Sequence, residues 1–255
     1  MKITFLGTNG WYTTPTGDTP CILIDTKDHY LILDAGNGIY KLDKYIKNNK
    51  KPISMFISHF HLDHVSGLHI LNKFEFKQGI DVYVGKGRSK DFDTIVNIPF
   101  TVGYKYKPEN IYKLKSEIRL HELSEKEEKI PFKASAIKQH HGYVDHGYRF
   151  EIGGKIIAYT GDCGFTDSAR KLAKDADLLI CECSNRKTED PDPWGHFDPT
   201  EAATLAKETG VKQLILTHFG TYAYPTLEDR KWAESEAKKI FPNTIAATDG
   251  FEFDL

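Results

Sequence analysis

The chain has 255 residues, of which 40% are hydrophobic and 12% aromatic, and its formal net charge at pH 7 is −2. This length and apolar content supply enough material for a sizeable core, which excludes an intrinsically disordered chain. The near balance of charge excludes a general attraction to nucleic acid, although a local basic cluster could act, the alternative being a solvated face. This cluster comprises Lys105, Lys107, Lys113, Lys115 and Arg119.

No linker rich in proline, glycine or serine divides the sequence, so we predict one domain over residues 1–255. The N-terminus turns polar too early for a signal peptide, and no apolar stretch is long enough for a membrane span. Cys181 and Cys183 alternate in an apolar run, which predicts buried thiols rather than disulfides or a zinc knuckle. The predicted location is the reducing cytoplasm.

Short apolar runs that end at polar residues predict strands along the first half of the chain. They cover residues 2–6, 21–25, 30–33 and 53–57, and the third run ends at Asp34. Helical patterns lie between or after them at 38–47 and 65–73.

The same arrangement recurs in the second half. Strands are predicted at 134–137, 156–159, 178–181 and 214–216, and helices at 167–174, 200–209 and 228–239. Polar residues follow these strands directly: His140, His141, Asp162, Glu182 and His218. Because strands and helices interleave in both halves, we predict an α/β protein whose helices cover two packed sheets.

The segment after the run 53–57 holds four metal-ligating side chains within six residues. Successive side chains of an extended chain alternate in direction, so His59 and His61 point the same way and can hold one cation. A turn after Leu62 then directs Asp63 and His64 toward a neighbouring site. Imidazoles with a carboxylate suit Zn²⁺, with Mn²⁺ and Fe²⁺ as alternatives. Solvated loop histidines are the simpler interpretation, but this spacing favours metal binding.

One loop cannot complete two metal sites, so further ligands must come from downstream strand ends. His140 or His141, Asp162 and His218 each follow an apolar run. An aspartate placed between two cations is suited to bridging them.

The arrangement resembles the metallo-β-lactamase superfamily along essentially the full chain, from residues 5–8 to residues 249–252. The superfamily pattern of His-x-His-x-Asp-His, a later His, Gly-Asp and a late His is matched by His59, His61, Asp63, His64, His141, Asp162 and His218. The resemblance implies a four-layer αββα sandwich of two mixed sheets flanked by helices. It also implies two divalent metal ions, one held by His59, His61 and His141 and one by Asp63, His64 and His218, with Asp162 bridging.

Within the superfamily the chain resembles the phosphodiesterase branch that includes ribonuclease Z and smaller cyclic phosphodiesterases. Residues 33–36 match its Asp-x-Gly strand end, and residues 147–149, Gly-Tyr-Arg, select His141 over His140. Glu182 and His196 fall where the branch carries a glutamate and a non-ligand histidine. The resemblance implies that His196, oriented by Glu182, assists the departing oxygen.

Two further residues are expected to support the metal site, and the role of a third is open. Asp63 could also orient the attacking water, and Asp34 could accept a hydrogen bond from a ligand imidazole. Cys163 stands where the branch usually has threonine, so its role is open. The remaining histidines are expected to be surface or structural: His29, His69, His121 and His146.

Ribonuclease Z carries a long basic arm between the ligand histidine and the bridging aspartate. Here only about twenty residues separate His141 from Asp162, which is room for two strands and a turn. The resemblance implies a binuclear metal-dependent hydrolase that acts on phosphodiesters. Because the arm is missing, we predict a small phosphodiester as the substrate, including cyclic or nucleotide diesters, rather than pre-tRNA. Substrate choice would depend on the loops at 9–19 and 89–108.

Alternative functions keep the same residues. An arylsulfatase-like or lactone hydrolase would use the same metal centre, and a tRNA 3′-processing endonuclease is disfavoured by the missing arm. A non-enzymatic metal sensor is disfavoured because such proteins usually have broken ligand sets. The expected partner is a small-molecule substrate, and a homodimer is one option for an open oligomeric state.

Overall fold

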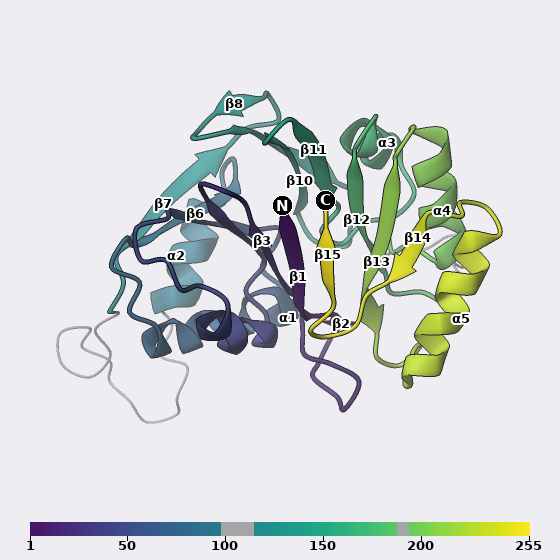
Figure 1. Ribbon diagram of the computed structural model, residues 1–255, viewed down its shortest axis with the longest axis horizontal. Helices are drawn as coiled ribbons and strands as arrows, with labels where there is room; N and C mark the ends of the chain where they lie inside the picture. The colour runs from purple at the N-terminus through teal and green to yellow at the C-terminus, as the bar shows by residue number, and fades with distance from the viewer. Residues whose placement is uncertain (98–114, 188–193) are drawn as a thin grey trace.

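The computed structural model describes residues 1–97, 115–187 and 194–255 (Figure 1). In these ranges two β-sheets pack face to face, and helices lie on the outer side of each. The chain ends lie close together, since the Met1 amino group donates to the Leu255 carbonyl at 3.3 Å.

The first sheet has seven strands among the described residues. In pairing order they are β15 (Glu252–Asp254), β1 (Lys2–Gly7), β3 (Cys21–Asp25), β4 (Tyr30–Leu33), β5 (Ile53–Ile57), β6 (Ile80–Gly85) and β7 (Ile118–Leu123). Pairing is antiparallel from β15 to β4 and parallel from β4 to β7. The carboxyl ends of β4, β5 and β6 therefore meet at one edge.

The second sheet repeats this plan with the rest of the chain. Its main path is β14 (Thr244–Ala246), β13 (Gln213–Gly220), β12 (Leu178–Cys183), β11 (Lys155–Tyr159), β10 (Asp145–Ile152), β9 (Lys133–Gln139) and β8 (Glu128–Lys129). Strands β11 to β14 are parallel and β8 to β11 antiparallel. The short strand β2 (Asn9–Gly10) pairs with the end of β13, which links the N-terminal segment to this sheet.

Three apolar cores separate four layers. Between the sheets, the Phe56 ring centre lies 5.3 Å from that of Tyr148 and 4.7 Å from that of Phe150. The first sheet is covered by η1 (Asn37–Lys44), α1 (Leu62–Val65), η2 (Ser66–Lys73) and α2 (Ser89–Asn97), and the second by α3 (Asp167–Ala173), α4 (Pro199–Glu208) and α5 (Leu227–Lys238). This arrangement confirms the predicted αββα sandwich of two mixed sheets.

Helix α4 begins where its sequence predicts, because its N-terminus is fully capped. The Asp198 side chain accepts hydrogen bonds from the backbone N–H groups of Thr200 and Glu201, and the Glu201 carboxylate accepts one from the Asp198 N–H. Pro199 occupies the first helical turn, where no intrahelical donor is needed. The helix thereby fixes the preceding segment, which carries His196, against the second sheet.

Three predicted elements differ in the structure. The helix predicted at 38–47 is the shorter 3₁₀ helix η1, and the one predicted at 65–73 divides into the end of α1 and the 3₁₀ helix η2. Gly67 in η2 packs closely on the preceding segment, since a Cβ on it would lie 2.3 Å from the Gly36 carbonyl oxygen. The predicted loop 89–108 is helical over Ser89–Asn97, where Phe92 and Ile95 form too short an apolar pattern to reveal a helix. Residues 98–108 lie outside the described residues.

The basic cluster has little support among the described residues, which exclude Lys105, Lys107 and Lys113. Arg119 is already paired, with its Nε 2.8 Å from Asp81 and its Nη1 2.6 Å from Glu117. Its charge is therefore largely neutralised locally.

Two further predictions concern cysteines and membranes. All four cysteines are buried free thiols, including Cys181 and Cys183, as predicted. In the part of the chain that the structure describes, no helix is long and apolar enough to cross a membrane.

Candidate metal centre

The segment after β5 changes from extended to helical chain, and this change divides its ligating side chains. His61 is extended and caps α1, and the His64 N–H donates to the His61 carbonyl at 3.0 Å. His59 and His61 therefore precede the helix, whereas Asp63 and His64 belong to its first turn. The predicted turn after Leu62 is this short helix.

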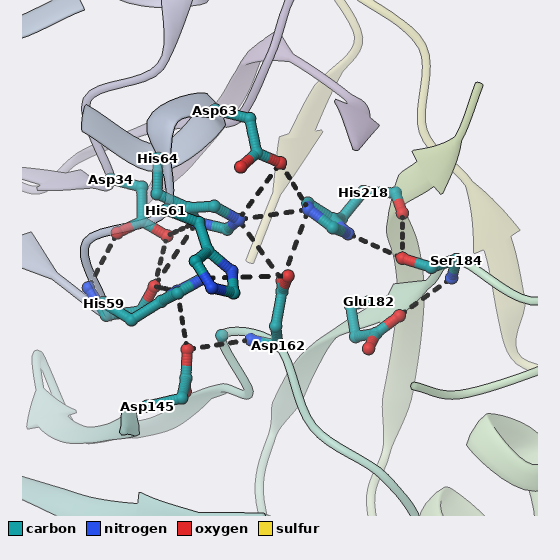
Figure 2. A network of polar contacts seen from close by, with 12 residues as sticks. Asp34, His59, His61, Asp63, His64, Asp145, Asp162, Glu182, Ser184 and His218 are labelled. Carbon is teal, nitrogen blue, oxygen red and sulfur yellow. Dashed lines mark hydrogen bonds and ion pairs between the residues drawn. The ribbon is translucent and has the colours of Figure 1, made fainter. Parts of the chain in front are cut away.

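The structure brings the seven predicted ligand residues together from both sheets. All of them except His141 are labelled in Figure 2. They form two groups, and in each group the possible ligand atoms lie within 4.8 Å of one another. We call His59, His61, His141 and Asp162 the first group and Asp63, His64 and His218 the second group. His140 is exposed and belongs to neither.

Asp162 lies between the groups. Its Oδ1 is 3.3 Å from the Nε2 atoms of both His64 and His218, and its Oδ2 is 3.9 Å from His59 Nε2. The preceding Gly161 has a φ of +61°, and a Cβ there would lie 2.4 Å from Asp145. Glycine thus allows the chain to bring the Asp162 carboxylate between the two groups.

The second group is compact. His64 Nε2 lies 3.0 Å from His218 Nε2, and Asp63 Oδ2 lies 3.2 Å from His218 Nε2 and 3.6 Å from His64 Nε2 (Figure 2). In the first group His141 Nε2 lies 3.3 Å from His61 Nδ1.

Hydrogen bonds on the outer side of three imidazoles determine their tautomers. His59 Nδ1 donates to Asp145 at 2.7 Å and His64 Nδ1 donates to Asp34 at 2.8 Å. His218 Nδ1 lies 2.8 Å from Ser184 Oγ, whose own hydrogen goes to the His218 carbonyl. Each Nδ1 therefore carries the hydrogen, and in the neutral imidazoles the Nε2 lone pairs point inward.

The electrostatics differ between the groups. Burial lowers the pKa of His59 to about 3 and that of His61 to about 4. Burial also opposes charge on His64 and His218, but the carboxylates around them, Asp162 first, raise the pKa of both. Negative potential is therefore strongest at the second group, which attracts positive charge most.

These residues fit divalent metal ions. Inward lone pairs and carboxylate oxygens at 3.0–3.6 Å repel one another unless a cation lies among them. His59 Nε2 is buried and has no hydrogen-bond partner among the described residues. Ligand atoms about 2.0–2.2 Å from a tetrahedral zinc ion lie roughly 3.3–3.6 Å apart, close to the spacing of the second group.

His196 and Glu182 form a pair beside both groups. His196 Nδ1 lies 2.6 Å from Glu182 Oε1, and the His196 ring centre is 5.0 Å from that of His141 and 6.2 Å from that of His218. Glu182 is buried, and its other oxygen accepts the Ser184 N–H at 2.8 Å. The imidazole is thus held at the edge of the ligand cluster without belonging to it.

Sequence reasoning missed three residues that position the ligands. Asp145 holds His59, Ser184 holds His218, and the Trp11 N–H donates to Asp63 at 2.8 Å. Asp145 begins β10 and Ser184 follows β12 directly, so both sit at strand ends, a signal that could have drawn attention to them. Nothing local in the sequence pairs Trp11 with a residue 52 positions away.

The predicted hydrogen bond from a ligand imidazole to Asp34 is present, and the imidazole is that of His64. Asp34 has a left-handed backbone, with φ +57°, and is fully buried. Its carboxylate accepts hydrogen bonds from His64, from Ser58 and from the Tyr159 hydroxyl at 2.5 Å. The remaining histidines lie outside both ligand groups, with His69 and His121 exposed, His29 half-buried and His146 buried.

A fold of two mixed sheets inside helices, with a histidine–aspartate cluster at the strand ends, defines a metal-dependent hydrolase class. A family model described as a beta-lactamase superfamily domain matches residues 29–219. The chain therefore belongs to the metallo-β-lactamase superfamily and is a metallo-hydrolase, as its sequence predicts.

Known proteins with similar sequence and structure agree with this assignment. The probable metallo-hydrolase YhfI of Bacillus subtilis is 27% identical, with 100% of each chain covered. Ribonuclease Z of Archaeoglobus fulgidus is 28% identical over 100% of this chain and 98% of its own. The crystal structure of the metallo-beta-lactamase fold protein YhfI from Bacillus subtilis has a TM-score of 0.79 and 24% identity, covering 99% of this chain and 98% of that one.

Proposed function

We propose that the protein is a phosphodiesterase with two divalent metal ions, Zn²⁺ before Mn²⁺ or Fe²⁺, that hydrolyses a small phosphodiester. The observation that carries the proposal is the His196–Glu182 pair at 2.6 Å, placed beside both ligand groups. A phosphodiester hydrolysis releases a basic oxygen that needs a proton, and a histidine beside the metals can supply it.

In this proposal the three histidines of the first group would hold one metal, the second group would hold the other, and Asp162 would serve both. The metals would lower the pKa of water and stabilise the oxygens of an in-line displacement. Asp63, whose Oδ2 accepts the Trp11 N–H, is held where it can orient the attacking water.

His196 is proposed to give its proton to the departing oxygen. Its Nδ1 faces the Glu182 carboxylate, so the proton available for transfer is the one on Nε2. Glu182 in turn is fixed by the backbone N–H groups of Ser184 and Cys163. Cys163 is thereby assigned a structural role through its backbone.

A small substrate is supported by the interval between His141 and Asp162. This interval consists of β10 and β11, joined by Gly153 and Gly154, both with positive φ. The turn leaves no room there for a long basic arm. Although several relatives carry the name ribonuclease Z, we propose that pre-tRNA is cleaved poorly.

The test of this function uses leaving groups of different basicity. His196→Ala should reduce the rate on an alkyl or nucleotide phosphodiester by roughly 10²–10⁴-fold and that on a nitrophenyl diester far less. Glu182→Gln should show the same pattern more weakly, because it acts through His196. His140→Ala is the matched control, since His140 is exposed and only one residue from His141.

Two results would contradict the assignment. Equal losses on both diesters would remove the acid role of His196, and loss of metal would make His196 a ligand. A wild-type rate that is highest on a sulfate monoester or a lactone would favour the arylsulfatase-like or lactone-hydrolase alternative instead.

We propose a single domain over residues 1–255, a cytoplasmic location supported by four free buried thiols, and a homodimer as the assembly to test first. Size-exclusion chromatography with light scattering measures the assembly directly.

A further inference from the structure

Most of the exposed large apolar side chains belong to segments that also carry metal-centre residues. Eight are exposed among the described residues. Six of these lie within a few residues along the chain of a metal-centre residue or of Trp11, whose N–H donates to Asp63: Trp11, Tyr12, Leu62, Tyr143, Trp194 and Tyr222. Exposed apolar side chains concentrated at one place mark a binding surface.

Two of these aromatic residues belong to loops in direct contact. The Gly142 N–H donates to the Trp194 carbonyl at 2.9 Å, and a Cβ on Gly142 would lie 2.7 Å from Trp194 Cε3. The indole therefore packs on the Gly142 backbone. Tyr143 follows Gly142, and its ring centre lies 5.6 Å from that of His61. Both aromatic residues thus flank Gly142, on the side of the first ligand group.

The half-buried Arg88 side chain supports the Tyr143 ring. The Arg88 guanidinium carbon lies 4.9 Å from the Tyr143 ring centre and 5.6 Å from that of Phe60. Arg88 Nη1 is paired with Asp91 at 3.1 Å, whereas Nε and Nη2 are buried and have no hydrogen-bond partner among the described residues. Positive charge beside the ring favours an anionic ligand there.

We propose that Tyr143 and Trp194 form a stacking platform for a flat ring of the substrate, so that phosphodiesters with an aryl or nucleobase group are preferred over aliphatic ones. The proposal rests on the proposed phosphodiesterase function and names the class of substrate. The Tyr143 and Trp194 side chains are 41% and 60% exposed. Exposed aromatic rings suit stacking with a flat ring of the substrate, whereas an aliphatic group would need an enclosed apolar pocket.

The test compares ligands of equal size that differ in flatness. Inhibition constants of phenylphosphonate and cyclohexylphosphonate are measured against hydrolysis of 4-nitrophenyl methyl phosphate. Wild-type protein should bind the flat ring about tenfold more tightly, as base–aromatic stacking predicts. Tyr143→Ala and Trp194→Ala should each bring the ratio of the two inhibition constants, cyclohexylphosphonate over phenylphosphonate, close to one. Trp194→Phe should retain much of this preference.

One control variant and one further test variant separate the platform from general effects on the protein. Tyr40→Ala removes an exposed aromatic ring that lies on η1 and should leave the ratio unchanged. Gly142→Ala should lower the ratio, because the added methyl group displaces the indole.

Uridine 5′-monophosphate and ribose 5-phosphate form a second pair of inhibitors. If the ratio of inhibition constants is larger for this pair than for the phosphonates, the preferred ring is a nucleobase.

Quenching of tryptophan fluorescence by phenylphosphonate gives a readout independent of turnover, and Trp194→Phe should abolish most of it. Equal inhibition by the flat and puckered rings, or an unchanged ratio in Trp194→Ala, would overturn the platform. If 4-nitrophenyl methyl phosphate is not hydrolysed, the proposed function fails, while the quenching still decides whether the platform binds flat rings.

Discussion

The two ligand groups differ in how firmly their side chains are held. In the second group His64 is fixed by Asp34, His218 by Ser184 and Asp63 by the Trp11 N–H. In the first group only His59 has such an acceptor, Asp145, whereas His61 is half-buried and His141 Nδ1 has no hydrogen-bond partner among the described residues. Preorganised ligands lose less conformational entropy on binding, so the second group should bind metal more tightly.

The two groups also differ in how accessible they are. The first group lies beside the exposed side chains of Tyr143 and Trp194, which form the proposed stacking platform. The second group is enclosed by β2 and β13, and a Cβ on Gly10 would lie 2.7 Å from the His218 ring. A rigid, buried ligand group and a more accessible one therefore lie side by side.

The largest expected effect comes from removing the residue that both groups share. Asp162→Ala should lower kcat/KM by at least about 10³-fold, because it removes the carboxylate that lies between the two groups. Asp167→Ala is the control, since that side chain is fully exposed in the same segment. A variant at Asp162 with near wild-type activity would show that the groups act independently.

An intermediate effect is expected from the acceptors of the outer hydrogen bonds. Asp34→Asn should weaken metal binding at the second group by about 10–100-fold, and Asp145→Asn should do so at the first group. Competition with a chromogenic chelator measures both. If either variant weakens both metals equally, the groups are not held separately and the comparison fails.

A smaller effect concerns pH and the surroundings of the first group. His146 is buried next to Asp145, and burial lowers its pKa to about 4. Because the folded state disfavours its protonation, its stabilising contribution is present above pH 6.5 and is lost as the pH falls toward 4.

Urea unfolding of wild type and His146→Gln tests this directly. Between pH 7 and pH 5 the wild type should lose about 2 kcal/mol more of its free energy of unfolding than the variant does. Using the difference between the two proteins cancels the titration of all other groups. Parallel pH profiles would show that His146 carries no such penalty.

The fold and the ligand set were largely accessible from the sequence for a physical reason. Strand periodicity and the polar residues at strand ends are local signals, and the segment from His59 to His64 concentrates four ligands in six residues. The resemblance then selected His141 over its neighbour His140, and the structure places His141 in the first group and leaves His140 exposed.

What the sequence could not supply depends on contacts between distant segments. The Asp145–His59 pair joins the two sheets, and the Trp11–Asp63 hydrogen bond spans 52 residues, so neither has a local pattern. Helix α2 was missed because Phe92 and Ile95 give less than two turns of periodicity. The close approach of Gly67 in η2 to the Gly36 carbonyl likewise has no local pattern in the sequence.

The most direct test of the account is a calorimetric titration of metal-free protein with Zn²⁺. We expect two ions per chain bound in two resolved steps, the tighter at the second group, with Asp34→Asn weakening the tighter step and Asp145→Asn the weaker one. Binding of a single ion by protein that is fully active would contradict the binuclear centre on which the proposed function depends.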